Sequence, residues 1–290
     1  IDVSKSYILG SSVIDGPNEV CEFDKLVGYE VDSVFGSVYD WTIIGGSQEN
    51  GDSSYQIEVD WASSGMGNVR VIQRAYDSVN DRWCVSPPNN LPITIRPLPT
   101  ANQILGPEEL CQYGDTAVYM ISGLPKSSYL WEINGSSDNI VGQGTNTIKI
   151  FWDTPGNKTL SVIETTELGC SGSEVKLPIT VNPKPTTSII TGPKTICPES
   201  SLNHEYSVTG DANSTYNWDI QGALNTTGNL TSTVSIDWDL SESSGILSVV
   251  ELSDKGCLGD TQRLNVIFDK LNIDLRFVSV GFPDDQMIID

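Results

Sequence analysis

Histidine is almost absent from this sequence, and basic residues are scarce. The 290 residues include one His, 16 Lys and Arg, and 38 Asp and Glu, so the formal net charge is −22. Nucleic acids and anionic membrane surfaces are bound by clusters of Lys and Arg, and the composition argues against both partners. The sequence also has no run of about 18 apolar residues, the length that a membrane-spanning helix needs, so we expect no membrane insertion.

Several chemical motifs are missing as well. The cysteines form no Cys-x-x-Cys pairs of the kind that bind zinc, and no EF-hand loop or glycine-rich phosphate loop occurs. A Ser-His nucleophile would have to use the single histidine, His204, which stands at the start of a strand-like run. We therefore predict no catalytic and no cofactor-binding residues, and we expect that the protein is not an enzyme.

What the sequence does contain is a segment that repeats three times. An Ile-x-Gly-Pro motif begins each repeat, and a Cys, a Tyr-x-Trp-x-Ile motif, a second Trp and a second Cys follow. The matching positions are Ile14, Cys21, Trp41, Trp61 and Cys84; Ile104, Cys111, Trp131, Trp152 and Cys170; and Ile190, Cys197, Trp218, Trp238 and Cys257. Self-similarity of this kind indicates an array of like modules, so the Trp columns are expected in the module cores.

Short β-rich runs fill each repeat, and turn residues separate them. Residues 147–150, for example, alternate polar and apolar side chains, and a Thr-Pro-Gly-Asn turn follows at 154–157. No run has convincing helical spacing. The pattern predicts an all-β protein of three tandem immunoglobulin-like sandwiches at residues 1–98, 99–184 and 185–270, with residues 271–290 beginning a further domain or a linker.

Pro-x-Pro segments join the predicted domains at residues 97–99 and 183–185. Such segments are extended and stiff, so the domains should point along one line as an elongated array of roughly 100 Å. After the third domain, Asp269 and Lys270 stand at the corresponding place. The third junction is therefore expected to pack differently.

The six cysteines fall two per repeat, with separations of 63, 59 and 60 residues. We predict one disulfide within each domain, and hence an oxidising compartment outside the cell. The alternative is that the cysteines are buried free thiols. The predicted bonds are Cys21–Cys84, Cys111–Cys170 and Cys197–Cys257.

The first repeat has a longer connection before its second cysteine, with five more residues between Val71 and Cys84 than the other repeats have at this place. An enlarged loop is where a sandwich gains a binding site. The alternative is a longer hairpin whose Trp folds onto the module. The candidate binding residues are Arg74, Tyr76, Arg82 and Trp83.

These landmarks resemble the polycystic-kidney-disease-like (PKD-like) branch of the immunoglobulin-like sandwiches. The resemblance rests on the Tyr-x-Trp-x-Ile strand, on a Gly four residues after its Trp, and on a Val-x-Val strand that leads to Gly-Cys at 169–170 and 256–257. The paired Cys, Ile-x-Gly-Pro starts and Pro-x-Pro ends are similar to tandem repeats of Bacteroidota surface proteins, including gliding-motility adhesins and type IX secretion cargo. The resemblance covers residues 10–268, although the acidic Gly-Asp-Gly of ordinary PKD domains is missing. It implies a cell-surface location and partners among secretion or outer-membrane anchoring proteins.

Calcium is the best remaining ligand hypothesis. Calcium takes six to eight oxygen ligands, several from carboxylates, and acidic residues stand beside the second Trp column. The alternative is a solvated acidic surface. The candidate ligands are Asp60, Asp153, Asp237 and Asp239.

Three short triplets match an O-glycosylation motif seen in Bacteroidota, Asp-Ser or Asp-Thr followed by a small apolar residue. They lie at residues 32–34, 77–79 and 115–117. The candidate acceptor residues are Ser33, Ser78 and Thr116.

Three functional hypotheses remain. The first is a non-enzymatic stalk or adhesin segment of a secreted bacterial cell-surface protein, whose modules contact neighbouring domains of the same polypeptide and present a terminal domain. The second is a recognition module that binds a surface glycan or a protein through residues 74–83. The third is an accessory spacer of an extracellular hydrolase.

Overall fold

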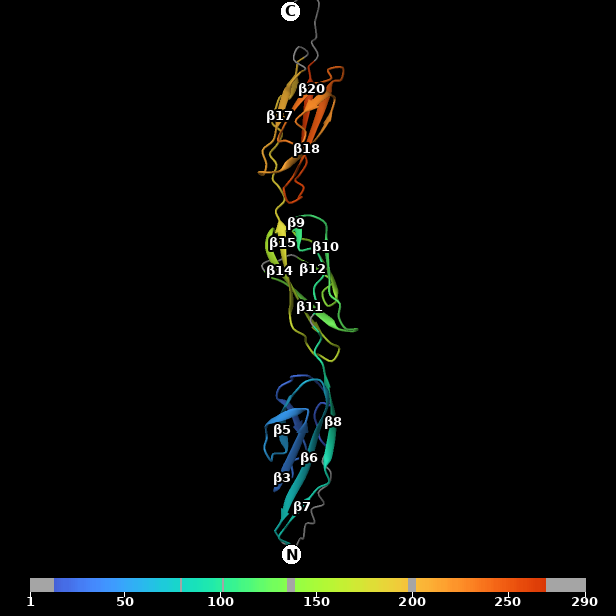
Figure 1. Ribbon diagram of the computed structural model, residues 1–290, viewed down its shortest axis with the longest axis vertical. Helices are drawn as coiled ribbons and strands as arrows, with labels where there is room; N and C mark the ends of the chain where they lie inside the picture. The colour runs from blue at the N-terminus through green and yellow to red at the C-terminus, as the bar shows by residue number, and fades with distance from the viewer. Residues whose placement is uncertain (1–12, 79, 101, 135–138, 198–201, 270–290) are drawn as a thin grey trace, which may run out of the picture.

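The chain forms an elongated stack of β-sandwiches. The computed structural model describes residues 13–78, 80–100, 102–134, 139–197 and 202–269. The regular elements in these ranges are strands, and three groups of them lie end to end along one axis (Figure 1). The predicted all-β class with three tandem sandwiches is confirmed. The described part of the chain accordingly contains no helix able to cross a membrane.

Module 1 is the N-terminal sandwich. Its strands are β1 (Glu19–Cys21), β2 (Val27–Glu30), β3 (Ser37–Ile44), β4 (Gly46–Asn50), β5 (Gln56–Trp61), β6 (Gly65–Asp77), β7 (Arg82–Val85) and β8 (Asn89–Arg96).

Module 2 follows, and module 3 ends the described chain. The strands of module 2 are β9 (Glu109–Cys111), β10 (Ala117–Met120), β11 (Ser128–Asn134), β12 (Ile140–Val141), β13 (Thr147–Ile150), β14 (Gly156–Thr165) and β15 (Val175–Asn182). Those of module 3 are β16 (Thr195–Ile196), β17 (His204–Ser207), β18 (Thr215–Gln221), β19 (Ala223–Thr227), β20 (Thr233–Trp238), β21 (Ser244–Leu252) and β22 (Gln262–Phe268).

The three modules share one sheet topology. In module 1 the larger sheet has the order β1-β8-β6-β3, with β7 paired to β6, and the smaller sheet has the order β2-β5-β4. Modules 2 and 3 repeat it as β9-β15-β14-β11 with β10-β13-β12, and as β16-β22-β21-β18 with β17-β20-β19. The first strand of each module runs parallel to the last strand, whereas the other pairings are antiparallel. This parallel pairing places Cys21 opposite Arg96 and Cys111 opposite Asn182, at the end of the module that leads to the next one.

Each core is built around a Tyr and the second Trp of the repeat. Tyr119 packs edge-on against Trp152 with ring centroids 6.3 Å apart, and the corresponding pairs in modules 1 and 3 are 6.0 Å apart. The first Trp of each repeat joins the same core, and Trp131 is 1% exposed, although Trp41 is only partly buried. Six of the seven Trp are therefore core residues, as the repeat predicted.

The Ile-x-Gly-Pro motif is explained by this Tyr. A Cβ built on Gly106 would lie 2.3 Å from Cδ1 of Tyr119, so only glycine lets the backbone lie flat against the ring. The Tyr119 hydroxyl then donates a hydrogen bond to the carbonyl oxygen of Pro107 at 3.1 Å. The same close contact recurs at Gly16 and Gly192. The motif thus docks the incoming chain on the core of each module.

Candidate functional site at the module junctions

Two disulfides join neighbouring modules. Cys21 of module 1 is bonded to Cys170 of module 2, and Cys111 of module 2 is bonded to Cys257 of module 3, with Cα–Cα distances of 5.5 and 5.4 Å. The predicted bonds within modules are therefore wrong. Four of the six cysteines are bonded, and both bonds cross a junction. The other two, Cys84 and Cys197, are free thiols.

The strand register explains why the two cysteines of one module do not meet. Cys21 lies opposite Arg96, beside the pair of Gly65 and Ile95 at the start of β6. Cys84 lies opposite Ala75, near the other end of β6. Ten residues of a strand span about 33 Å, whereas a disulfide needs Cα atoms within about 7 Å. Each module therefore carries one cysteine at each end and bonds to the facing end of its neighbour.

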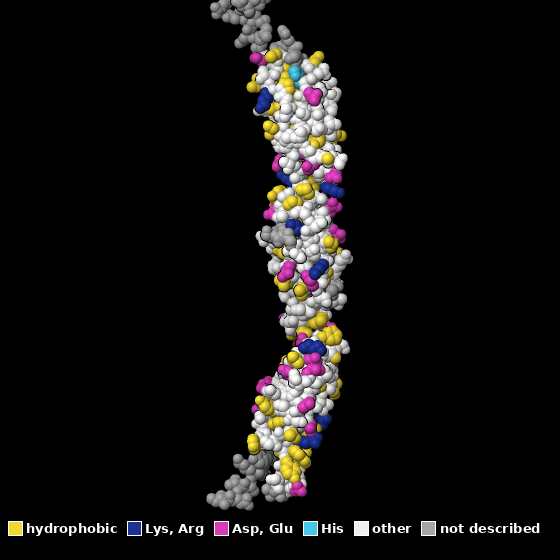
Figure 2. Space-filling view, turned by 90° about the vertical axis from the view of Figure 1, so that its left-hand side faces the viewer, with side chains coloured by type: hydrophobic (Ala, Val, Ile, Leu, Met, Phe, Trp, Pro, Cys, Tyr) yellow, Lys and Arg dark blue, Asp and Glu magenta, His cyan; other side chains and the backbone are white. Residues whose placement is uncertain are grey.

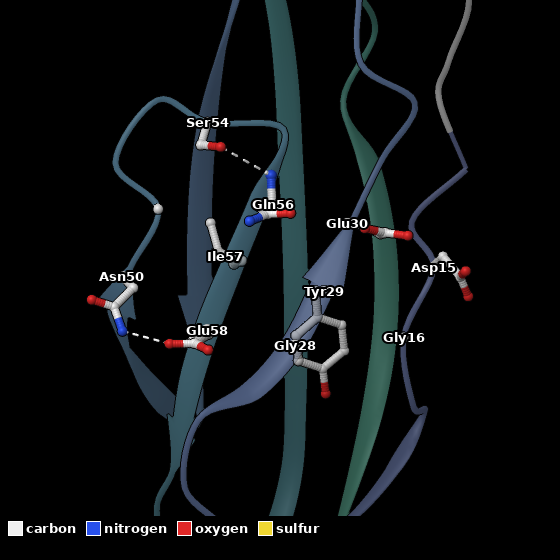
Figure 3. A pocket seen from close by; sticks show the side chains of 11 residues that line it. Asp15, Gly16, Gly28, Tyr29, Glu30, Asn50, Ser54, Gln56, Ile57 and Glu58 are labelled. Atoms are coloured by element: carbon white, nitrogen blue, oxygen red, sulfur yellow. Dashed lines mark hydrogen bonds between the residues drawn. The ribbon is translucent and has the colours of Figure 1, made fainter.

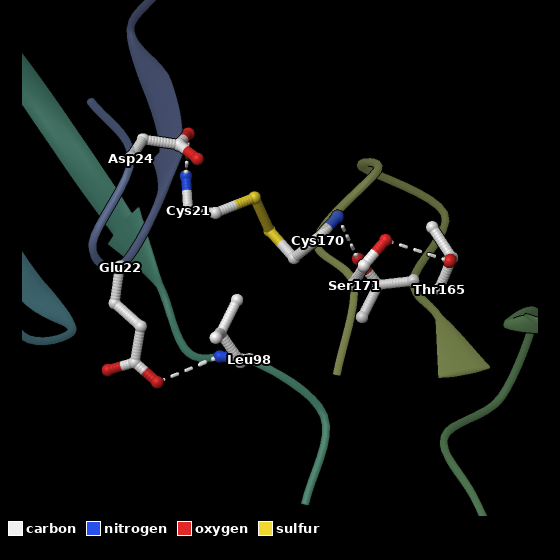
Figure 4. Close-up of a disulfide and its surroundings, with 8 residues drawn as sticks. Cys21, Glu22, Asp24, Leu98, Thr165, Cys170 and Ser171 are labelled. Atoms are coloured by element: carbon white, nitrogen blue, oxygen red, sulfur yellow. Dashed lines mark hydrogen bonds between the residues drawn. A yellow bond between two sulfur atoms is a disulfide. The ribbon is translucent and has the colours of Figure 1, made fainter. Parts of the chain in front are cut away.

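The Glu22 carboxylate holds the segment that connects modules 1 and 2. Glu22 follows Cys21, and its carboxylate accepts hydrogen bonds from the N–H groups of Leu98 at 2.9 Å (Figure 4) and of Ser64 at 3.0 Å. The bond from Leu98 and then that from Ser64 lower the pKa of Glu22 below its usual 4.5. Because Leu98 belongs to the connecting segment, Glu22 holds that segment against module 1.

A hydrogen-bonded turn presents Cys170 on the module 2 side. The N–H of Cys170 donates to Oγ1 of Thr166 at 3.1 Å, and the N–H of Thr166 donates to the carbonyl oxygen of Cys170 at 2.9 Å. A Cβ built on Gly172 would lie 2.9 Å from the carbonyl oxygen of Pro99. The connecting segment therefore passes directly over Gly172, and a larger residue would push it away.

The junction between modules 2 and 3 repeats this arrangement with an amide in place of the carboxylate. Gln112 follows Cys111, and its Oε1 accepts a hydrogen bond from the N–H of Lys184 at 3.2 Å. Its Nε2 donates to the carbonyl oxygen of Asp153 at 2.7 Å. The Lys184 ammonium also forms a salt bridge across the junction with Asp260, at 2.5 Å, but this exposed pair contributes little stability.

A buried carboxylate holds the same connecting segment from the module 3 side. Glu251 is fully buried and accepts hydrogen bonds from the Thr187 hydroxyl and from the N–H of Asp211, both at 2.7 Å. A Cβ built on Gly259 would lie 3.1 Å from Oγ1 of Thr187. Module 3 is therefore attached to its linker by a bond to a side chain that solvent does not reach.

The length of chain that each disulfide closes gives the scale of its effect. The bonded cysteines are 149 and 146 residues apart. In the loop-entropy treatment, one bond of this span destabilises the unfolded chain by about 5 kcal/mol, with the mechanism model-dependent. The two loops overlap between residues 111 and 170, so unfolding of any one module is constrained by a bond to another.

The residues that hold the linkers were not found from the sequence. The signal was a side chain with a carboxylate or amide oxygen directly after the first cysteine, as in Glu22 and Gln112, and a glycine two residues after the second, as in Gly172 and Gly259. A Glu beside a Cys is unremarkable by itself. It gains its role only from contact with a linker that starts about 75 residues later.

A family model described as a PKD-like domain matches the chain three times, at residues 9–81, 97–181 and 183–266. The chain belongs to the PKD-like family. Each match falls on one module, and the match in module 1 ends before Cys84. No curated protein is significantly similar to the chain in sequence.

Several solved structures match the chain at low sequence identity. An I-band fragment of titin is 10% identical, with a TM-score of 0.41, and the match covers 89% of this chain and 99% of the fragment. A Drosophila N-cadherin fragment is 12% identical, with a TM-score of 0.33 and coverage of 89% and 76%. The Bacteroides ovatus SGBP-B of a mixed-linkage glucan utilization locus, in complex with a mixed-linkage heptasaccharide, is 14% identical, with a TM-score of 0.22 and coverage of 92% and 70%. Identities this low say nothing about function.

The longer connection of the first PKD-like module is a hairpin of β6 and β7. Tyr76 lies opposite Trp83, with ring centroids 5.3 Å apart, and the two residues are 49% and 53% exposed. Trp83 therefore does not fold onto the module core. Figure 2 shows hydrophobic side chains gathered at this N-terminal end of the molecule. Arg74 forms an ion pair with Asp40 of β3, and Arg82 Nε lies 4.0 Å from the Asp77 carboxylate. The four candidate residues share one hairpin, because Arg74 and Tyr76 lie on β6 and Arg82 and Trp83 lie on its partner β7.

A surface depression of about 560 Å³ lies beside β2 and β5 of module 1 (Figure 3). Its lining includes the acidic residues Asp15, Glu30 and Glu58 together with Tyr29. The Glu58 carboxylate accepts a hydrogen bond from the Asn50 amide at 2.5 Å. Two polar side chains of the lining are therefore already hydrogen-bonded to each other.

The candidate calcium ligands are not brought together. The Asp60 carboxylate binds the Lys25 ammonium at 2.8 Å and the N–H of Leu26 at 2.9 Å. Asp153 lies in module 2. In module 3, Asp237 accepts a hydrogen bond from the N–H of Asn203, just before β17, and Asp239 accepts one from the N–H of Ser241, two residues later. Among the described residues, no group of three or more His, Cys, Asp or Glu side chains is placed to hold a metal ion.

The remaining predicted residues lie on the surface or outside the description. Ser33, Ser78 and Thr116 are exposed. His204 begins β17, opposite Ile236 of β20. The predicted segment 271–290 lies outside the described residues.

Proposed function

We propose that the three PKD-like modules form a stiff, non-enzymatic spacer. The observation that supports it is the pair of disulfides that cross both junctions, each reinforced by a side chain that binds the connecting segment. A linker alone lets two modules swing about one point. A second covalent connection on the same junction removes most of that freedom, because both attachments must move together.

The cellular setting that fits this spacer is the bacterial surface. Disulfides form and persist outside the reducing cytosol, and the net charge of −22 keeps a long surface rod soluble. The spacer would be a stalk or adhesin segment of a secreted Bacteroidota protein, exported as type IX secretion cargo. It would present a terminal domain and contact secretion or outer-membrane anchoring proteins. Ser33, Ser78 and Thr116 would be its glycan acceptors, which intact-mass measurement on material from the native host would detect.

Small-angle X-ray scattering tests the spacer. The oxidised chain should scatter as one stiff rod with a maximum dimension of roughly 100 Å. The double variant Cys21→Ser/Cys111→Ser keeps the modules but removes both bonds, so it should show a broader distribution of dimensions. Cys84→Ser/Cys197→Ser is the matched control, because it alters only the free thiols. A compact or broadly distributed oxidised chain would refute the spacer.

A second candidate function is recognition by the hairpin of module 1. The observation that favours it is the exposed pair of Tyr76 and Trp83, since surface aromatic rings are the side chains that stack on sugars or anchor protein partners. This recognition would place a surface glycan or protein at the N-terminal end of the rod.

A glycan array with the intact chain tests recognition. Specific binding that is lost in Trp83→Ala and kept in Phe35→Ala supports it, since Phe35 is a fully exposed aromatic residue of the same module. Both substitutions should change the free energy of unfolding by less than about 0.5 kcal/mol relative to the unmodified chain, as surface substitutions usually do. Binding that survives in Trp83→Ala would contradict this role.

A further inference from the structure

The free thiol Cys197 occupies the same structural position as two bonded cysteines. It directly follows β16, which runs parallel to β22 as β1 does to β8 and β9 to β15. Cys21 and Cys111 stand at the ends of β1 and β9, and each bonds to the module that follows. Cys197 is exposed at the corresponding end of module 3.

The free thiol Cys84 is structurally equivalent to the other two bonded cysteines, Cys170 and Cys257. In module 1 the N–H of Ser86, two residues after Cys84, donates to the carbonyl oxygen of Gln73 at 2.9 Å. In module 2 the N–H of Gly172, two residues after the second cysteine, donates to the carbonyl oxygen of Glu164 at 2.8 Å, and module 3 has the same bond. The longer hairpin therefore does not shift the register at Cys84. Its counterparts each bond to the module that precedes them.

The three modules thus follow one rule. The first cysteine of a module bonds forward, and the second cysteine bonds backward. Within the three described modules, the rule leaves Cys84 as a backward-facing thiol of module 1 and Cys197 as a forward-facing thiol of module 3. The two free thiols are therefore complementary halves of one more bond of the same kind.

Modules 1 and 3 keep these two cysteines, but the residues next to them in the sequence differ from those that bind a linker at the two junctions. Ser86 stands where Gly172 and its counterpart let the connecting segment pass, and it is buried, with its hydroxyl bound to the carbonyl oxygen of Pro87 at 3.0 Å. At the other end, Pro198 follows Cys197 in the sequence where Glu22 and Gln112 bind the linker, and no Pro-x-Pro follows module 3. This combination fits a partner module that is not attached through such a linker.

We propose that copies of this chain join head to tail through a disulfide between Cys197 of one copy and Cys84 of the next. The partner face is the β6–β7 hairpin, where the exposed rings of Tyr76 and Trp83 lie close to Cys84 and supply apolar contact. The contact joins different surfaces of the two copies, so it repeats without closing and builds filaments.

The bond requires an oxidant of the disulfide class. One cysteine thiolate attacks a small-molecule disulfide, forms a mixed disulfide and releases one thiol. The second cysteine thiolate then attacks the mixed disulfide and releases the other thiol. The two cysteines are oxidised by two electrons in total and lose two protons, and the small-molecule disulfide is reduced to two thiols.

Two single variants test the pairing, because each keeps one free thiol. Cys84→Ser offers only Cys197, and Cys197→Ser offers only Cys84. The variants, one of them labelled with ¹⁵N, are mixed in equal amounts in oxidised and reduced glutathione, quenched with an alkylating agent and analysed by non-reducing mass spectrometry. Random pairing of equal amounts gives as much mixed dimer as the two homodimers together. We expect the ratio of mixed dimer to homodimers to lie about tenfold above this random value, the factor that about 1.4 kcal/mol of contact free energy gives.

The unmodified chain should form a ladder of multimers whose cross-linked peptide joins Cys84 to Cys197, and the double variant Cys84→Ser/Cys197→Ser should form none. Tyr76→Ala/Trp83→Ala, which keeps both thiols, should bring pairing back towards random. Random pairing in the mixture, an excess of either homodimer, or accumulation of glutathione adducts without dimers would overturn the proposal. None of these outcomes bears on the spacer, which is tested through the other four cysteines.

Discussion

Stretching single molecules from their two ends distinguishes the observed disulfides from bonds within modules. With Cys21–Cys170 and Cys111–Cys257 in place, the shortest covalent route follows residues 1–21, crosses to 170, returns along the chain to 111, crosses to 257 and leaves at 290. This route contains about 110 residues and reaches about 390 Å when fully stretched. The fully reduced chain should reach about 1,000 Å.

Two single substitutions then have different expected results. Cys84→Ser removes a free thiol, so the limit stays at about 390 Å. Cys21→Ser opens one bond, and the route then follows residues 1–111 and 257–290, which reach about 500 Å. Bonds within modules would give nearly the same length for the unmodified chain. They would also make the two variants equal, at about 600 Å, because either change would open the loop of module 1.

The assay is force spectroscopy with handles at both termini, with free thiols alkylated beforehand and a reduced sample as the control. The observed pairing also places three polypeptide routes in parallel between the two disulfides, through residues 21–111, 111–170 and 170–257. Load is therefore shared, and we expect the first extension to need more force in the oxidised than in the reduced chain. Equal limits for Cys84→Ser and Cys21→Ser would refute the pairing.

Local contacts give three further expectations. Gly106→Ala should lower the free energy of unfolding in denaturant titration by about 1–3 kcal/mol, because the new Cβ lies 2.3 Å from the Tyr119 ring, whereas Gly28→Ala meets nothing within 4 Å and is its control. Glu22 has a lowered pKa, so the stability that it contributes is present above pH 4.5 and is lost as the pH falls below that value; Glu22→Gln should flatten this part of the pH dependence in thermal melts. Burial raises the pKa of Tyr29 and of Tyr119 to about 12, so their contribution to stability is lost as the pH rises from about 10 to 12, and absorbance titration of the folded chain should show both ionising near pH 12.

The sandwich cores could be predicted from the sequence because every core column recurs three times. In each repeat, a Tyr on the first strand of the smaller sheet and the second Trp stand at matching places. They form the edge-on pairs whose ring centroids lie 6.0–6.3 Å apart. Repetition separates such residues from surface residues without an alignment. Trp83 breaks the column, and it is also the exposed Trp of the hairpin.

The junctions were harder to predict because their contacts join residues from two modules. Gly172 and Pro99 are neighbours only when module 2 stands directly after module 1, and nothing in either local sequence indicates that approach. For Asp60, in contrast, the local sequence suggested a role that the structure does not support. Its place beside the second Trp suggested a cation ligand, but the Lys25 ammonium and a backbone N–H already bind it.

The disulfides combine both difficulties. In a repeat, each module supplies one cysteine of each kind, so bonds within modules and bonds between modules use the same positions and the same spacing. The deciding quantity is the distance along β6, and it depends on the parallel pairing of Glu19–Cys21 with residues 94–96. That pairing joins segments about 75 residues apart, which periodicity does not reveal. Once the register is known, the number of free thiols settles the choice: bonds within modules leave none, whereas bonds between modules leave one at each end, and those are Cys84 and Cys197.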